Sequence, residues 1–166
     1  MYFSIIIYPS KKMANQNNQE LTLVRTYNAP RELVYKAWTD PKHLAQWWGP
    51  SGFTNPVCEA NAVPGGAIRI HMYHPDYPNH WVKGVFHELV PPEKIVFSNN
   101  AHIGEGNPPS IEAINTVTLE EQNGVTKLTL HVIVSKFAPE MAPALAGMEE
   151  GWSQSLQRLQ NLIQKS

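Results

Sequence analysis

Three of the seven histidines lie close together in the sequence and could in principle hold a metal ion. They are His71, His74 and His80. Structural zinc takes four ligands, often in paired short spacings with cysteine or carboxylate support. Here His71 falls in an expected strand, whereas His74 and His80 flank a proline-rich turn, so the spacing does not specify convergence. We therefore predict neither a metal nor another cofactor.

Acid–base or nucleophilic catalysis has little support in the sequence. Glu88 follows His87 in an expected strand, and adjacent strand residues point to opposite faces, so the two cannot serve one site. Glu88 could transfer protons only if its side chain entered a cavity; otherwise it is a surface carboxylate or an ion-pair partner. The single cysteine, Cys58, has no basic neighbour and is expected to be a small buried hydrophobe. No catalytic residue is predicted, and enzymatic activity stays open.

Aromatic residues are the most informative group, because the chain has five Trp, six Tyr and five Phe. Pockets for apolar ligands are lined by such rings with a few polar groups among them. The alternative is that the rings simply fill the core. The cavity candidates, which include Tyr73, His71 and Glu88 as polar anchors, are Trp47, Trp48, Phe53, His71, Tyr73, Trp81, Phe86, Glu88, Phe97, Trp152 and Leu156.

The residues before the first tryptophans predict a strand and two short helices. Alternating apolar and polar positions indicate a strand over Leu21–Tyr27. Pro30 then suits the first turn of a helix that ends near Trp38. Asp40 followed by proline signals a second helix start, and Gly49-Pro50 signals its end. Trp47 and Trp48 close this second helix, and periodicity alone does not say which of them faces a cavity.

From Pro64 onward the sequence predicts an antiparallel meander. In the strand Ala67–Tyr73, Ile68, Ile70 and Met72 share one face, and Arg69, His71 and Tyr73 share the other. Further strands are expected over Trp81–Leu89 and Ile95–Ser98, followed by a long loop over Asn99–Ser110. Asn123-Gly124 lies between two alternating runs and is a strong hairpin signal. We expect Val117 and Leu119 to share the inner face with Leu128, Leu130, Val132 and Val134.

A single long helix is expected at the C-terminus. After Pro139 and Pro143, apolar residues recur at spacings of three and four over about five turns. These residues are Leu145, Met148, Trp152, Leu156, Leu159 and Ile163. The order of strand, two short helices, consecutive antiparallel strands and one long helix predicts an α+β fold.

Composition and charge exclude several classes of protein. With 166 residues, 42% of them hydrophobic, the chain can bury a continuous core. A net charge of −1 without a basic cluster disfavours nucleic acid as a partner. The N-terminal apolar run is too short to span a membrane and lacks signal-peptide features. We expect a cytoplasmic protein with no membrane contact, either a monomer or a homodimer.

The N-terminal segment is expected to lie outside the main domain. Met13 opens a polar stretch that reads like a natural start, so Met1–Lys12 is either an over-extended start or an extra edge strand. We assign residues 1–20 to an N-terminal extension and residues 21–166 to a single domain.

Several of these segments together resemble a known family. They are RTYNAPRELVYKAWTDPKHLAQWWGP, VPGGAIRI, KGVFHELVPPEKIVFS, GVTKLTL and EEGWSQSLQRL. They are similar to the family named after the activator of the heat shock protein 90 ATPase, within the START-like (SRPBCC) superfamily. The resemblance implies a helix-grip fold, like that of the birch pollen allergen, in which a curved antiparallel sheet wraps around the long C-terminal helix and encloses a cavity.

Three hypotheses for function follow from the residues and the resemblance. The first is a protein that binds an apolar or aromatic small molecule, such as a lipid or polyketide, between the sheet and the C-terminal helix. The second is a cyclase- or aromatase-type enzyme that uses an acid–base residue in the cavity. The third is a stress-related co-chaperone. The named co-chaperone has a separate N-terminal domain, to which nothing in Met1–Glu20 corresponds, and this weakens the third hypothesis.

Overall fold

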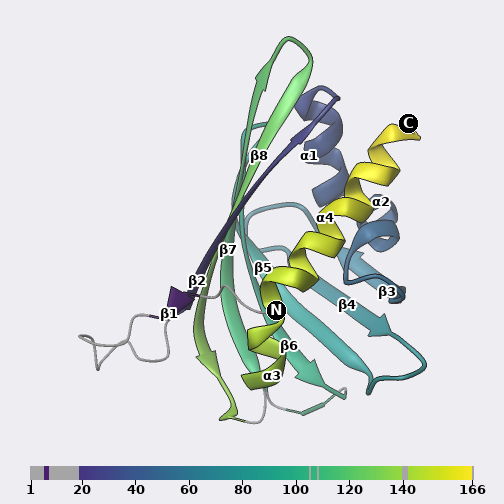
Figure 1. The fold of residues 1–166 in the computed structure, drawn as a ribbon, viewed down its shortest axis with the longest axis vertical. Coiled ribbons are helices and arrows are strands. Elements are labelled where there is room, and N and C mark those ends of the chain that lie inside the picture. Colours follow the sequence, from purple (N-terminus) through teal and green to yellow (C-terminus); the bar gives the residue numbers. More distant parts are fainter. Residues whose placement is uncertain (1–5, 8–18, 105, 108, 140–141, 166) are drawn as a thin grey trace.

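The protein folds as one curved antiparallel sheet that wraps around its C-terminal helix (Figure 1). The structure, a computed structural model, describes residues 6–7, 19–104, 106–107, 109–139 and 142–165. The strands lie in the order β1-β2-β8-β7-β6-β5-β4-β3. Their bounds are β1 Ile6–Ile7, β2 Gln19–Tyr27, β3 Thr54–Ala60, β4 Ala67–Tyr73, β5 His80–Val90, β6 Lys94–Ile103, β7 Ile111–Gln122 and β8 Val125–Phe137. The helices are α1 Arg31–Thr39, α2 Pro41–Trp47, α3 Ala142–Ala146 and α4 Met148–Gln164.

This architecture is the α+β helix-grip fold expected from the sequence. The two short helices follow β2, and α4 lies across the concave side of the sheet (Figure 1). We call the sheet face toward α4 the inner face and the opposite one the outer face. None of the helices in the described residues combines the length and the apolar character needed to cross a membrane.

The short helices begin and end where the sequence predicts. The Asp40 carboxylate accepts a 2.9 Å hydrogen bond from the backbone N–H of Lys42 and so caps α2, whose first residue is Pro41. At the other end, the N–H of Trp48 donates to the carbonyl of Leu44. These helices are too short to be stable alone, so their buried residues must hold them in place.

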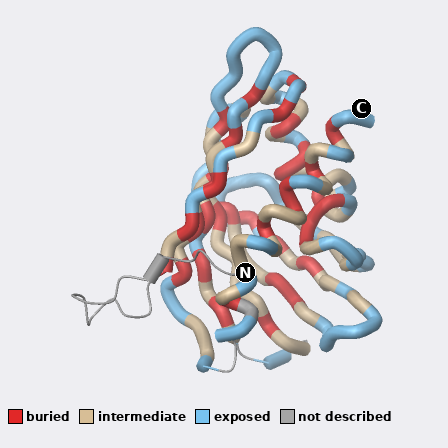
Figure 2. Tube along the Cα trace, viewed as in Figure 1, coloured by how far each residue is buried: buried red, intermediate tan, exposed pale blue. Residues whose placement is uncertain are grey.

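Alternation along the strands separates the two faces of the sheet, and Figure 2 shows the resulting pattern of buried and exposed residues. The hairpin between β7 and β8 turns at Asn123-Gly124, where both residues have positive φ (54° and 78°), as a type I′ turn requires. The inner-face set predicted for this hairpin is buried, which confirms its register: Val117, Leu119, Leu128, Leu130, Val132 and Val134.

Two predictions about the strands need correction. Strand β3 is not among the predicted strands, because Thr54–Ala60 contains Pro56 and alternates poorly. It lies at the edge of the sheet, where proline is tolerated. The predicted loop Asn99–Ser110 is also too long. Strand β6 continues to Ile103, since Asn99–Ala101 pairs with β7 and His80 pairs with Ile103.

The predicted C-terminal helix is divided into two segments. The short α3 ends before Gly147, and α4 begins at Met148. The break falls at Gly147, a poor helix former. The apolar stripe is nevertheless buried as predicted, with Trp152, Leu156, Leu159 and Ile163 facing the sheet.

Hydrogen bonds fasten α4 to strand β2 of the sheet. The Tyr27 hydroxyl donates to the carbonyl of Leu156 (3.2 Å), and Arg25 Nη2 donates to the Ser153 hydroxyl (3.0 Å).

Strand β1 forms one edge of the sheet, where Ile6 and Ile7 pair with Glu20 and Gln19 of β2. The rest of the segment Met1–Lys12 lies outside the described residues.

Candidate functional site

A cleft with two connected compartments lies between the inner face of the sheet and the start of α4. The inner chamber has a volume of about 360 Å³, and the outer vestibule about 730 Å³. Four residues line both compartments and mark their junction: Pro50, His80, Gly147 and Gly151.

The inner chamber is apolar and uncharged. Its walls come from β4, β5, β6, β7, α4 and the turn after α2, and they contain no Asp, Glu, Lys or Arg. Burying a charge without a partner is costly, so such a space suits a neutral ligand. The lining residues are Trp48, Gly49, Pro50, Met72, His80, Val82, Asn99, Ala101, Ile111, Gly147, Met148, Gly151, Trp152 and Ser155.

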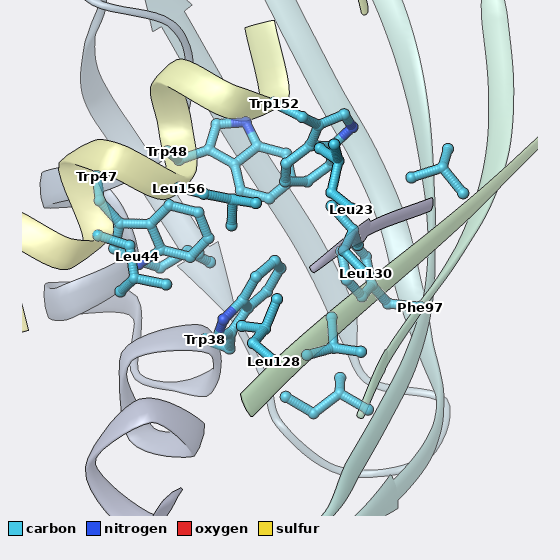
Figure 3. Close-up of a cluster of buried hydrophobic side chains, with 14 of the residues drawn as sticks. Leu23, Trp38, Leu44, Trp47, Trp48, Phe97, Leu128, Leu130, Trp152 and Leu156 are labelled. Carbon is cyan, nitrogen blue, oxygen red and sulfur yellow. The ribbon is translucent and has the colours of Figure 1, made fainter. Parts of the chain in front are cut away.

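The neighbouring residues Trp47 and Trp48, labelled in Figure 3, have different surroundings. Trp47 is fully buried, and its indole N–H donates to the carbonyl of Ala37 (2.9 Å) on α1. Its ring packs edge-on against Trp38, with centroids 4.6 Å apart. Trp48 instead lines the chamber and meets Trp152 edge-to-face at 5.4 Å. Trp47 therefore packs α2 against α1, and Trp48 forms the chamber wall beside Trp152.

Aromatic side chains also surround the outer vestibule. Phe53 stacks on Tyr77, with centroids 5.9 Å apart and an interplanar angle of 13°, and it contacts His74 at 5.1 Å. Across the vestibule lie Glu150 and Gln154 of α4. The vestibule is thus more polar than the chamber, and both compartments are open to solvent.

Two polar side chains stand out among the chamber walls. Asn99, on β6, accepts a 2.7 Å hydrogen bond at Oδ1 from Nδ2 of the fully buried Asn115. His80 lies at the junction, and burial lowers its pKa below the usual 6.5, an effect that the Pro78 carbonyl opposes. At neutral pH the His80 ring is therefore uncharged.

Four of the predicted cavity residues lie on the outer face instead. The Trp81 ring is stacked on His71, with centroids 4.7 Å apart and an interplanar angle of 8°. The Arg69 guanidinium lies over the same ring, 4.4 Å from its centroid. Tyr73 lies on the same face, and Glu88 forms an ion pair with Lys94 (3.2 Å). Alternation places the residues of β4 on two faces but does not say which face is the concave one, so sequence reasoning chose polar anchors from the wrong side.

The other predicted residues lie on the inner side, in several environments. Phe86 and Phe97 border a void of only about 10 Å³ beneath Trp48. Leu156 and Trp47 pack in the core, and Phe53 lies in the vestibule.

His80, Asn99 and Met148 line the chamber but are not among the residues predicted for it. Met72, predicted to share one face of its strand with Ile68 and Ile70, also lines the chamber, and this shared face was the signal that could have added it to the site. Asn99 was assigned to a loop, which concealed its inward position on β6.

Metal binding and thiol chemistry find little support in the geometry. Within the described part of the chain, no three His, Cys, Asp or Glu side chains cluster as metal ligands would. Burial raises the pKa of the Cys58 thiol to about 11, so the group is protonated at neutral pH and is a poor nucleophile.

Comparisons with known proteins agree with this fold. The family model described as Activator of Hsp90 ATPase homolog 1-like protein matches residues 28–164. A crystal structure of a protein from Chromobacterium violaceum is 31% identical, with a TM-score of 0.71 over 86% of this chain and 96% of that one. A solution structure of a protein from Arthrobacter aurescens is 22% identical, with a TM-score of 0.75 over 100% and 94% of the two chains. No curated protein matches the chain significantly.

Proposed function

The chain belongs to the family of Activator of Hsp90 ATPase homolog 1-like proteins, and on this premise we propose that it binds an apolar or aromatic small molecule in the inner chamber. The observation that carries the proposal is the uncharged chamber walled by Trp48 and Trp152. A preformed apolar space with few polar groups is what small-molecule sites have in common.

The volume of the inner chamber favours a compact ligand. A cavity of roughly 150 Å³ holds one benzene ring. The chamber, at about 360 Å³, therefore suits a body of about two rings. The vestibule beyond Gly151 could hold a more polar extension of the same molecule.

Titration with 2-ethylnaphthalene, a neutral two-ring hydrocarbon, tests the proposal. We expect saturable binding that changes the emission of Trp48 and Trp152 and raises the melting temperature, since a ligand that binds only the folded state stabilises it. If neither property changes up to the solubility limit of the probe, the proposal fails.

Gly151→Leu is predicted to block the cleft. A Cβ atom built on Gly151 meets only the Pro50 ring, at 3.7 Å, so a side chain fits there and projects into the junction of the two compartments. We expect the affinity for 2-ethylnaphthalene to fall about tenfold or more, which corresponds to about 1.4 kcal/mol. Isothermal titration calorimetry measures the change.

Two control variants distinguish a blocked cleft from a damaged fold. Gly151→Ala adds a good helix former but little volume, so it should preserve binding and raise stability by up to about 1 kcal/mol. Gln157→Leu places the same leucine on the exposed side of α4 and should leave binding unchanged. Equal affinities for Gly151→Leu and Gly151→Ala would mean that the ligand does not occupy the junction.

A second candidate function, proton transfer in the cleft, is favoured by one observation. His80 lines both compartments, and it is uncharged at neutral pH because burial lowers its pKa. A neutral imidazole in an apolar site can accept a proton from a bound substrate. Glu88, the acid–base residue considered from the sequence, lies outside the cleft.

The base-promoted opening of 5-nitrobenzisoxazole, a neutral two-ring molecule, tests this second function. The base removes the ring C–H proton, the N–O bond breaks, and a coloured phenolate forms. We expect His80→Gln to lower the rate at least about tenfold, and His71→Gln, on the outer face, to leave it unchanged. The rate should be constant from pH 7 to 8 and fall only at more acidic pH, as the ring, whose pKa burial lowers, becomes protonated. Equal rates for the two variants would exclude His80 as a base.

A further inference from the structure

We propose that the ligand of the inner chamber is a neutral molecule of about two rings with a carbonyl oxygen, and that the Asn99 side-chain amide donates a hydrogen bond to this oxygen. This inference rests on the proposed function and adds to it the polar group that the chamber recognises. It is carried by the Asn99–Asn115 pair and by the absence of charge in the chamber walls.

The first step concerns Asn115, which is fully buried on the inner face of β7. Its Nδ2 atom donates to the carbonyl of Phe97 (3.4 Å) and to Oδ1 of Asn99 (2.7 Å). A backbone carbonyl can only accept hydrogen bonds, so the contact with Phe97 favours the orientation in which the amide nitrogen of Asn115 faces β6. The Phe97 carbonyl therefore sets the preferred orientation of this amide.

The second step concerns Asn99, whose orientation follows from that of Asn115. Because Asn115 offers a donor, Asn99 must turn its own oxygen toward it, as the 2.7 Å hydrogen bond shows. The NH₂ group of Asn99 then points away from Asn115, and in the described part of the chain it donates to no protein group. Since Asn99 lines the chamber, this NH₂ group is a donor held in a fixed direction at the wall of an apolar space.

The third step is the chemistry that such a donor selects. A ligand oxygen that accepts this hydrogen bond satisfies the donor, whereas a purely apolar ligand leaves it unpaired at a cost. A carboxylate would also accept the bond, but the chamber walls contain no cation to balance its charge, and His80 is neutral. A neutral carbonyl group fits both conditions.

A matched ligand pair tests this inference. 2-Acetylnaphthalene and 2-ethylnaphthalene share one ring system and differ by a carbonyl group in place of a CH₂ group. We expect Asn99→Leu to weaken the ketone about threefold to tenfold, the value of one neutral hydrogen bond, and not to weaken the hydrocarbon. Asn100→Leu, on the outer face of the same strand, should change neither affinity. Naphthalene-2-carboxylate should not bind measurably.

The outcomes separate this inference from the proposed function. If neither naphthalene binds the unmodified protein, the proposed function itself fails. If the hydrocarbon binds but Asn99→Leu changes both affinities equally, or if the carboxylate binds as tightly as the ketone, this inference is overturned and the binding function stands.

A measurement on the unmodified protein covers the case in which Asn99→Leu does not fold. The side-chain NH₂ signals of ¹⁵N-labelled Asn99 should move when 2-acetylnaphthalene is added and stay nearly unchanged with 2-ethylnaphthalene. Identical shifts with the two ligands would overturn the inference.

Discussion

Replacing Trp47 with alanine is expected to destabilise the protein by about 3–5 kcal/mol, as for other large buried aromatic residues. Trp47 has no exposed surface, packs against Trp38 and donates its indole N–H to the Ala37 carbonyl. Its removal opens a cavity between α1 and α2 and leaves a buried acceptor unpaired. Urea denaturation followed by far-UV circular dichroism measures the loss.

The loss of stability in Trp47→Ala can be compared with that of two other substitutions. Trp47→Phe keeps a ring but removes the N–H donor, so we expect a smaller loss of about 1–3 kcal/mol. Trp81→Ala removes a tryptophan from the outer face, where it lies beneath Arg69 and His71 and outside the main core. A smaller loss for Trp47→Ala than for Trp81→Ala would contradict the role assigned to Trp47 as the packing element between the two helices.

Arg158→Met is expected to cost about 2–4 kcal/mol of stability. Arg158 Nη1 donates to the carbonyls of Trp48, Gly49 and Pro50 at 2.8–3.1 Å, and Nη2 donates to Gln46 at 3.2 Å. One guanidinium thus binds carbonyls at the end of α2 and in the turn that follows it, and ties both to α4. Charge-assisted hydrogen bonds contribute roughly 1.5–3 kcal/mol each, and contact with solvent reduces their sum.

The neighbouring positions provide the controls for Arg158. Arg158→Lys keeps the charge but not the planar fork, so it should recover only part of the stability. Gln157→Met makes a comparable change at the exposed adjacent position and should stay within about 0.5 kcal/mol of the unmodified protein. Thermal melts of the three variants measure these differences. Equal melting temperatures for Arg158→Met and Gln157→Met would show that the carbonyl contacts add nothing to stability.

The fold was predictable where local signals are strong. Asp40-Pro41 has the capping chemistry of a helix start, and Asn123-Gly124 has the positive φ angles that a tight hairpin needs, so both boundaries follow from the residues themselves. The strand Thr54–Ala60 carries no such signal. Its pairing with β4 depends on the sheet already being present, and this long-range effect cannot be read from one segment.

The candidate site was less predictable than the fold. Alternation separates Ile70 from His71 but leaves open which of them faces α4, and that choice depends on the curvature of the whole sheet. Asn99 becomes a wall residue only because β6 extends beyond Ser98 to pair with β5 and β7. Which of Trp47 and Trp48 lines the chamber likewise depends on the position of α4.

Nuclear Overhauser contacts between 2-ethylnaphthalene and ¹³C-labelled methionine methyl groups test the central claim most directly. Met72 on β4 and Met148 at the start of α4 line opposite sides of the inner chamber. Our account predicts that protons of the bound probe show contacts to both methyl groups and to the Trp152 ring. Contacts to Tyr73 and Trp81 on the outer face, with none to Met72 or Met148, would contradict it.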